Sequence, residues 1–356
     1  MILSLTALAV SPFLPVWLGG NADINASASA YFAIIAMGIP AFQFSIFGSG
    51  MLRSSGNMVV PSVMSVVMMS LDVVFNSFLI FPTRTVSILG TAFTMPGAGL
   101  SVEGAAIGTV SAECIAASIT MYLLCFRRGE LSLRRRPGRF RPTRRVLGKA
   151  LHISLPMGLQ QGIMCSAYVA TTLIIAPLGT FAIAANSFGI IIESLCYMPG
   201  YGIADAATTL VGQSLGAARH ELMKRFAWLS VLLGMAVMAV MGVVMYVGAP
   251  FAMSLMTPVS EVRNLGAGIL RIEAFAEPMF AAAIVSYGVF VGAAQTLVPS
   301  LMNLASMWGV RITLAALLAP TMGLRGVWLA MCIELCFRGF IFLVRLRFWR
   351  SGRSKG

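Results

Sequence analysis

Apolar runs of about twenty residues recur along the whole chain, with short polar connections between them. A helical run of that length matches the thickness of the hydrocarbon core of a bilayer. Because lipid offers backbone amides no water partner, only helices or closed barrels can span it, and runs this long exclude barrel strands. Charged residues are 10% of the chain, against about a quarter in soluble proteins. The sequence therefore predicts an all-α polytopic membrane protein.

We expect ten transmembrane helices, placed by the apolar runs. They are Ile2–Leu18, Tyr31–Met51, Met58–Phe81, Val102–Cys125, Ala150–Leu178, Ala182–Val211, Phe226–Val247, Ile269–Val291, Val298–Leu318 and Leu324–Val344. The connections are short except for Pro82–Leu100, Gly248–Gly268 and a basic stretch, RRGELSLRRRPGRFRPTRRVLGK, at 127–149.

The basic residues predict the orientation of the chain. One alternating set of connections, with the tail, holds 19 Lys and Arg, whereas the opposite set holds only Arg84, Arg263 and Arg325. The positive-inside rule then places the linker and the C-terminus in the cytoplasm, in a multi-pass protein of the inner (plasma) membrane. The net charge of +13 does not indicate nucleic-acid binding, because no aromatic residues alternate with the basic ones as a stacking platform requires.

An internal repeat predicts two related bundles. Without a gap, GIPAFQFSIFGSGMLRSSGNMVVPSVM matches AEPMFAAAIVSYGVFVGAAQTLVPSLM, and GLSVEGAAIG at 99–108 then matches GLRGVWLAM at 323–331. The first match pairs Pro40 with Pro278, Gly50 with Gly288 and Pro61 with Pro299, at an offset of 238. Repeats of this kind are typical of secondary transporters.

The repeat also predicts the domains. They are a four-helix N-terminal lobe at 1–126, the basic linker at 127–149, a six-helix C-terminal lobe at 150–346 and a basic tail at 347–356. The offset would place the counterpart of Ala150 about 88 residues before Met1. We therefore expect the N-terminal lobe to be truncated by two helices.

Several stretches resemble the multidrug and toxic compound extrusion (MATE) transporters. They are GSGMLRSSGNMVVPS, GLSVEGAAIGT, PLGTFAIAANSFGIIIESLCYMPGYGIADAATTLVGQSLGAAR, GAAQTLVPS and WGVRITLAALLAPTMGLRGVWLAM. The resemblance implies twelve helices in two six-helix lobes. It also implies export of small organic, often cationic, compounds in exchange for protons or sodium ions. The proton-linked carboxylate of the family lies on its first helix, and its sodium-linked pair falls on Met164 and Phe280, so neither ion site carries over intact.

Carboxylates inside the membrane are the main site candidates, since an insertion cost of about 2.5–3.5 kcal/mol must be offset. Glu273 and Glu277 are four apart, hence on one helical face, and Pro278 follows to bend the helix and free a carbonyl. Their repeat partners are apolar, which indicates ion coupling in one lobe. The alternative is that Glu273 is interfacial and that Arg271 neutralises one acid.

Glu193 and Tyr197 share a helical face near Pro199, so a carboxylate, a ring and a kink could hold a cation. The alternative is a hydrogen bond between helices. We expect Asp205 to serve as a cap or a bond to a neighbouring helix. Glu334 and Arg338, one turn apart, predict an internal ion pair.

Five prolines are candidate kinks or hinges: Pro40, Pro278, Pro199, Pro61 and Pro299. The G-x-x-x-G pairs Gly104/Gly108 and Gly288/Gly292 predict close helix contacts. Six cysteines lie in apolar runs without C-x-x-C spacing, so we predict no disulfide framework and no metal site.

The favoured function is a secondary antiporter that exports cationic drugs in exchange for H⁺ or Na⁺. It needs no cofactor and no oligomer, and only substrate and membrane lipid are expected partners. No nucleophile–base constellation and no G-x-x-x-x-G-K-[ST] loop occurs, so neither enzymatic catalysis nor an ATP site is predicted. Two alternatives stay open: a lipid-linked saccharide flippase, disfavoured if Glu193 and Glu277 line a cavity without arginines, and a truncated chain inactive in transport.

Overall fold

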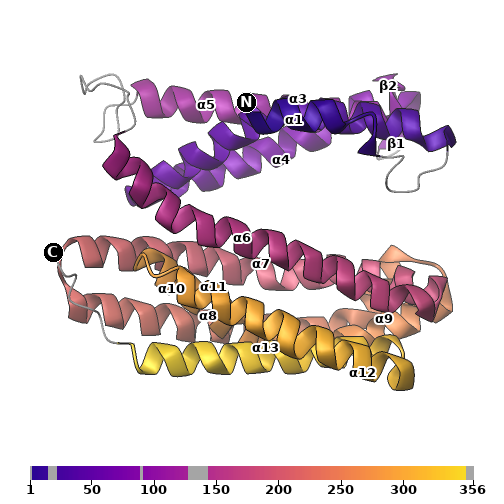
Figure 1. Cartoon of the computed structure of the whole chain (residues 1–356). Helices are drawn as coiled ribbons and strands as arrows, with labels where there is room; N and C mark the ends of the chain where they lie inside the picture. The colour runs from indigo at the N-terminus through magenta and orange to yellow at the C-terminus, as the bar shows by residue number, and fades with distance from the viewer. Residues whose placement is uncertain (1, 15–21, 89–90, 127–142, 350–356) are drawn as a thin grey trace. The chain divides into compact units, whose positions relative to one another are not determined.

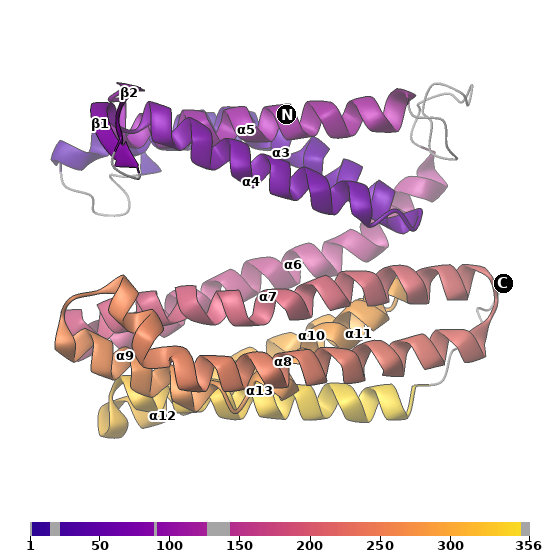
Figure 2. The same cartoon turned by 180° about the vertical axis from the view of Figure 1, so that it is seen from behind.

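The fold is that of a computed structural model, which describes residues 2–14, 22–88, 91–126 and 143–349 (Figures 1 and 2). The chain forms two compact units, Met1–Phe140 and Arg141–Gly356, which we call the N-terminal and C-terminal units. Most of the predicted linker, 127–142, lies outside the described residues, and its last residues, from Arg144, begin a helix.

The N-terminal unit packs long apolar helices against one another. Its helices are α1 (Ile2–Val10), α3 (Ala22–Ser54), α4 (Val59–Leu79) and α5 (Ser101–Phe126). Helix α5 packs on both α3 and α4, and α1 packs on α3. The Ser4 hydroxyl donates to the Ala36 carbonyl at 2.6 Å, which ties α1 to α3 inside the apolar unit. Most of the expected first span is thus a short helix, and its end, from residue 15, is not described.

The connection at Pro82–Leu100, expected to be a loop, contains a two-stranded antiparallel sheet. Strands β1 (Pro82–Ile88) and β2 (Thr91–Ala98) pair in a register that sets Arg84 opposite Met95. Alternating Thr, Val and Ile suit a strand, and hairpin pairing satisfies the backbone groups of a connection this long. The all-α prediction therefore holds for the spans and misses this hairpin.

The C-terminal unit is a bundle of helices that run side by side (Figure 1). Its elements are α6 (Arg144–Ile175), η1 (Ala176–Leu178), α7 (Thr180–Gly216), α8 (His220–Met256), α9 (Ser260–Glu273), α10 (Glu277–Gly292), α11 (Leu297–Ala305), the π-helix η2 (Ser306–Ile312), α12 (Thr313–Met322) and α13 (Leu324–Arg347). Helices α11, η2 and α12 form one continuous span. Helices α9 and α10 form a second, bent by 59°.

Within the described residues, eight helices are long and apolar enough to cross a membrane, and nine if the bent pair is one span. Six of these nine lie in the C-terminal unit, which confirms the six-helix expectation there. The prediction of a long connection at Gly248–Gly268 was wrong. Helix α8 continues through Pro250 to Met256, and α9 begins at Ser260, because lipid favours a helix whose remaining backbone bonds are internal.

The two units share details that match the sequence repeat. Pro61 and Pro299 are each the third residue of their helix, α4 and α11. Gly99 and Gly323, at φ +66 and +59, lie in the turns before α5 and α13. Helix α5 crosses α4 with the two backbones in close contact at Gly104. A methyl group added there would lie 2.5 Å from the Leu79 carbonyl oxygen.

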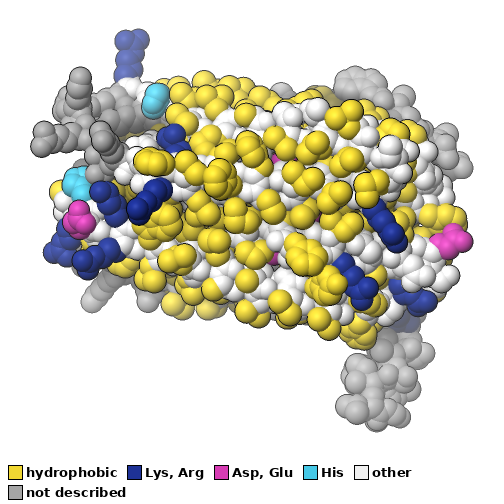
Figure 3. Space-filling model, turned by 90° about the horizontal axis from the view of Figure 1, so that it is seen from below, with side chains coloured by type: hydrophobic (Ala, Val, Ile, Leu, Met, Phe, Trp, Pro, Cys, Tyr) yellow, Lys and Arg dark blue, Asp and Glu magenta, His cyan; other side chains and the backbone are white. Residues whose placement is uncertain are grey.

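Two apolar core clusters stabilise the C-terminal unit, one near each end of the bundle. The first surrounds Trp328 and Ile269, and the second surrounds Phe290 and Phe342. Side chains exposed on the outside are also apolar, for example Val247 at 72% on α8. Figure 3 shows one face on which hydrophobic side chains cover the middle while Lys and Arg gather toward the ends. Such a band is what a lipid-facing surface requires.

Candidate functional site

The C-terminal unit contains a cavity of about 400 Å³, built by helices α6, α7 and α10 with α11 and α13. Its lining residues are Met157, Gln160, Gln161, Met164, Tyr168, Tyr201, Ala204, Asp205, Thr208, Phe280, Ala283, Ile284, Tyr287, Gly288, Val291, Asn303 and Arg338. Cavities of this size, apolar with a few polar groups, are typical small-molecule sites.

The chemistry of the cavity is aromatic and amidic. Three tyrosines and Phe280 present rings, and the Tyr287 hydroxyl donates to Oε1 of Gln160 at 3.0 Å, which fixes both side chains in the wall. Asp205 is the one carboxylate and Arg338 the one cation among these lining residues. Aromatic faces, thioethers and a carboxylate form a surface suited to flat organic cations.

Met164 and Phe280, the two positions that the family resemblance matches to its sodium-linked carboxylates, both line this cavity. Helices α6 and α10 thus bring the two positions to one site. In this chain, a thioether and a ring occupy them, so a cation bound there would lack the oxygen ligands that hard cations prefer.

Beside the cavity lies a buried charged cluster, which we define as Glu193, Glu273, Glu277, Glu334, Arg311 and Arg338. The four carboxylates are 7%, 1%, 1% and 0% exposed, respectively. Electrostatic interactions connect Glu273 to Glu193, Glu277, Glu334 and Arg311, and Glu193 also interacts with Arg338. Four carboxylates face two guanidinium groups, so the fully ionised cluster carries an excess of two negative charges. Binding a cation or protons would offset that excess.

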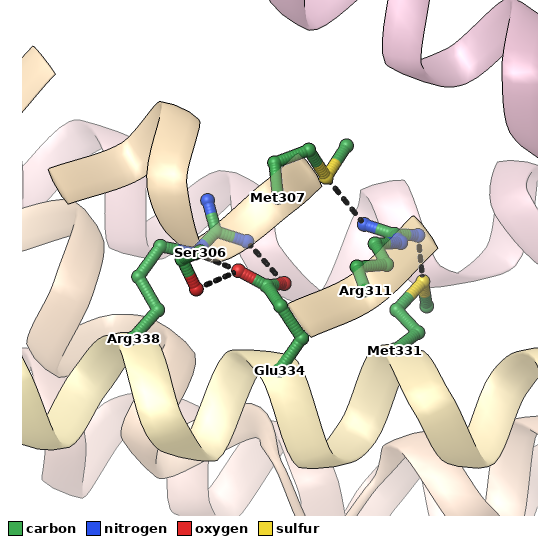
Figure 4. A network of polar contacts seen from close by, with 6 residues as sticks. All are labelled: Ser306, Met307, Arg311, Met331, Glu334 and Arg338. Atoms are coloured by element: carbon green, nitrogen blue, oxygen red, sulfur yellow. Dashed lines mark hydrogen bonds and ion pairs between the residues drawn. The ribbon is translucent and has the colours of Figure 1, made fainter. Parts of the chain in front are cut away.

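The predicted ion pair between Glu334 and Arg338 is confirmed (Figure 4). Nη2 of Arg338 donates to Oε2 of Glu334 at 3.0 Å, and the Ser306 hydroxyl donates to Oε1 at 2.5 Å. The Glu334 side chain is fully buried, and these bonds offset the cost of holding its charge inside the bundle.

Arg311 is held differently, by sulfur. Its guanidinium contacts the thioethers of Met307 and Met331, from η2 and α13 (Figure 4). Thioether sulfur is a weak acceptor, so these contacts leave the charge of Arg311 poorly compensated. The π-helix carries Arg311 in the middle of a span, and single-turn π-helices are frequent at functional sites. Longer-range attraction to Glu193 and Glu273 supplies the remaining compensation.

Glu273 and Glu277 lie on either side of a helix break, which corrects the prediction that one helix carries both. Helix α9 ends at Glu273, α10 begins at Glu277, and the two axes differ by 59°. With 14 residues before the break and 16 after it, both carboxylates lie near the middle of the bent pair of helices. Each side chain is 1% exposed, so the helices of the bundle enclose both of them.

Arg271 does not neutralise these acids, contrary to the other alternative. Its side chain is exposed and its Nε donates to the Tyr246 carbonyl at 3.3 Å. Within the described residues it forms no ion pair with Glu273 or Glu277. Two Glu277 oxygens and Oε2 of Glu273 are buried and accept no hydrogen bond from described residues.

The break is accommodated by Gly242 of α8. A methyl group there would lie 2.7 Å from the Ala274 carbonyl oxygen and 3.2 Å from Cβ of Glu277. Pro278 has no N–H to bond that carbonyl, as expected, and it lies in the first turn of α10, where a missing N–H costs least. The N-terminus of α10 favours a negative charge at Glu277.

Glu193 and Tyr197 lie on α7, next to the cavity but not among its lining residues. The Tyr197 ring contacts the rings of Tyr201 and Phe280, each at 5.6 Å between centroids, and both of those residues line the cavity. Glu193 lies one turn before Tyr197 on the same helix. The role of these two residues stays a prediction.

The five candidate hinges divide into three groups. Pro278 is at the break, whereas α3 and α7 continue through Pro40 and Pro199. Pro61 and Pro299 occur in the first turn of their helices and so mark helix starts, which corrects their assignment as kinks. Proline is tolerated there because the first N–H groups have no intrahelical partner.

Sequence reasoning missed several residues of the site. Gln160, Tyr168, Tyr287 and Asn303 line the cavity without a signal in the sequence, since uncharged polar residues in apolar runs are common. Asp205, expected to be a cap, lines the cavity as well. Its position in a span was a usable signal, because intramembrane acids usually face a cavity.

Comparisons with known proteins agree with this architecture. Two proteins called probable multidrug resistance protein NorM are similar to the chain: one from Thermotoga maritima is 25% identical over 93% of this chain and 68% of its own length, and one from Idiomarina loihiensis is 27% identical over 97% and 74%. A crystal structure of MATE in the straight conformation superposes with a TM-score of 0.87 at 19% identity, covering 97% of this chain and 74% of the other.

A solved outward-facing multidrug resistance MATE family transporter of the MOP superfamily has a TM-score of 0.85 at 20% identity, again over 97% and 74%. At these identities the structures support the fold alone. The model of the MatE family matches residues 1–78 and 156–317, more than half of the chain. This match, together with the membrane-spanning bundle, shows that the chain belongs to the MatE family.

Proposed function

We propose that the chain is a secondary active multidrug antiporter, which exports organic cations in exchange for protons or sodium ions. The observation that carries the proposal is the pairing of an aromatic cavity with the buried charged cluster in one bundle. The cavity suits flat cationic compounds, and the cluster suits the coupling ion, because its excess of carboxylates makes uptake of positive charge favourable. The names of the NorM relatives support the drug-export part.

The two sites are close enough to influence each other. Arg338 belongs to both, since its guanidinium pairs with Glu334 and lines the cavity. Tyr197, one turn after Glu193 on α7, packs on Phe280 of the cavity wall. Binding a cation at Glu277 or Glu193 would therefore change the field felt by a substrate, which is the differential interaction that coupled exchange requires.

We propose that the protein lies in the inner membrane, with its linker and its tail in the cytoplasm. One end of the bundle carries Arg345, His152 and Gln295 around a common pocket, so the start of α6 and the end of α13 lie on the same side. The excess of Lys and Arg at this end supports a cytoplasmic location.

Dye transport in proteoliposomes tests the function. The full chain is reconstituted with ethidium outside or inside, and an inward gradient of protons or of Na⁺ is imposed. We expect gradient-driven ethidium exchange that chain-free vesicles lack. Transport that requires ATP, or no transport under either gradient, would contradict the proposal, and the second result would favour the inactive alternative.

The flippase alternative rested on whether a cavity lined by Glu193 and Glu277 lacks arginines. Neither glutamate lines the cavity, and Arg338 does, so that argument no longer applies as stated. The charge of Arg338 is nonetheless offset by Glu334, and Asp205 remains in the wall. The cavity therefore offers no free cationic surface for an anionic saccharide, and organic cations stay our proposed cargo.

A further inference from the structure

Three arginines face one open pocket at the end of the bundle where α8 meets α9. The pocket has a volume of about 530 Å³ and is lined by Pro250, Phe251, Ser254, Arg263, Asn264, Ala267, Gly268, Arg271 and Arg325. Helices α8 and α9 and the first turn of α13 contribute these residues. The pocket lies away from the aromatic cavity and shares no lining residue with it.

The packing of two of these arginines holds their guanidinium groups in place. Arg325 lies over Gly268, where a methyl group would be 3.5 Å from Nε and 3.6 Å from Nη2 of the arginine. Arg271 donates to the Tyr246 carbonyl, and its Cζ lies 5.5 Å from the centroid of the Tyr246 ring. Both contacts leave guanidinium N–H groups available for a ligand.

The charge of this pocket is not balanced by protein carboxylates. Its lining contains no Asp or Glu, and within the described residues none of the three arginines forms an ion pair. Guanidinium groups that line one pocket repel one another, so a bound anion would relieve the repulsion. The set of connections with few basic residues holds Arg84, Arg263 and Arg325. Two of these three, Arg263 and Arg325, line this pocket.

The ligand must also fit an apolar surface. Phe251 lines the pocket and is 70% exposed, and Val247 and Phe275, 72% exposed each, continue the apolar outer surface of α8 and the α9–α10 connection. Such residues face acyl chains in a bilayer. A molecule that presents a phosphate to arginines and hydrocarbon to this surface satisfies both sides at once.

We propose that Arg263, Arg271 and Arg325 form a binding site for the headgroup of an anionic phospholipid, in the leaflet opposite to the end where α6 begins. Forked guanidinium groups bind phosphodiester oxygens with two parallel hydrogen bonds. Ser254 and Asn264, also in the lining, can bond the glycerol or remaining headgroup oxygens. The site is independent of the proposed transport cycle.

Lipid exchange onto the purified full chain tests the site. Phosphatidylglycerol and phosphatidylcholine are titrated in detergent, and bound lipid is counted by native mass spectrometry. For R263Q/R325Q we expect about 25-fold weaker phosphatidylglycerol binding, since each arginine near a lipid headgroup contributes about fivefold. Binding of phosphatidylcholine should not change.

The matched control is R219Q/R225Q, which removes two exposed arginines from the opposite end of α8 and leaves the same net charge. We expect less than a twofold effect. An equal loss in the control would overturn the site, as would equal binding of phosphatidylcholine by the wild-type chain. Displacement of the lipid by inorganic phosphate at equal concentration would show a site for free phosphate and so would also contradict the proposal.

A charge-preserving variant guards against misfolding of the double variant. R325K keeps the positive charge but loses the fork, and we expect about fivefold weaker phosphatidylglycerol binding with an unchanged elution volume. If gel filtration shows that R263Q/R325Q is misfolded, R325K decides the test. Wild-type affinity of R325K for phosphatidylglycerol would then overturn the proposal.

Discussion

Nε of Arg338 lies 2.9 Å from Oε1 of Glu334, one turn earlier on α13 and fully inside the bundle. The pair lies between the two apolar core clusters, with Trp328 on one side along the helix and Phe342 on the other. Because Arg338 also lines the aromatic cavity, this ion pair joins the part of the protein that we propose binds ions to the part that we propose binds substrate.

Arg338→Gln should destabilise the C-terminal unit by about 3–5 kcal/mol, because it leaves Glu334 buried without its countercharge. Thermal unfolding in detergent measures the change. Arg347→Gln, an exposed position on the same helix, should change the stability by less than about 0.5 kcal/mol. Adding Glu334→Gln to Arg338→Gln should recover part of the loss, and no recovery would show that the pair is not the cause.

Glu277→Gln should reduce gradient-driven ethidium exchange about tenfold, in the range usual for coupling free energies, with normal membrane levels. The amide keeps the shape of the side chain and removes the charge that a coupling ion would offset. We expect Glu193→Gln to behave in the same way. Glu261→Gln, exposed at the start of α9, is the control, and unchanged exchange in both cluster variants would remove them from the mechanism.

Tyr201→Ala and Tyr168→Ala should each raise the apparent KM for ethidium by about twofold to fivefold, since a ring face contributes roughly 0.5–1 kcal/mol to cation binding. Tyr201→Phe should retain most of the affinity because it keeps the ring. Initial rates across dye concentrations provide the measurement. Tyr246→Ala, outside the cavity, is the control, and an equal effect there would argue against a cavity-specific role.

Gly292→Ala should destabilise the packing of α10 on α7 by about 1–3 kcal/mol, because the added methyl group would meet the Thr208 backbone. Gly202→Ala on α7 has nothing within 4 Å of the new methyl group and should be neutral or stabilising by up to about 1 kcal/mol. Unfolding temperatures in detergent distinguish the two. Equal stability of both variants would show that this crossing tolerates a side chain.

The sequence predicted the helical spans of the C-terminal unit well, because twenty apolar residues have few alternatives in lipid. It also predicted the Glu334–Arg338 pair, since residues four apart on a helix must be neighbours. It failed at the connection near Pro250 and at Glu273–Glu277, where the same local pattern permits a continuous helix, a break or a loop. At the second of these, Gly242 on another helix makes room for the break.

The cavity shows the limit of such reasoning most clearly. Gln160 and Tyr287 are 127 residues apart and meet only because α6 and α10 pack together. No local pattern marks either residue, so their role depends on tertiary contacts.

The amino-acid sequence by itself determined the class of the protein, the number of spans in its larger unit and the repeat that relates its units. Each of these follows from hydrophobicity and local spacing, which act within one segment. Only the tertiary structure decided which polar side chains face a shared cavity and which carboxylates gather with Arg311 and Arg338. Those relations depend on the angles and contacts between helices, which close packing of many side chains sets together.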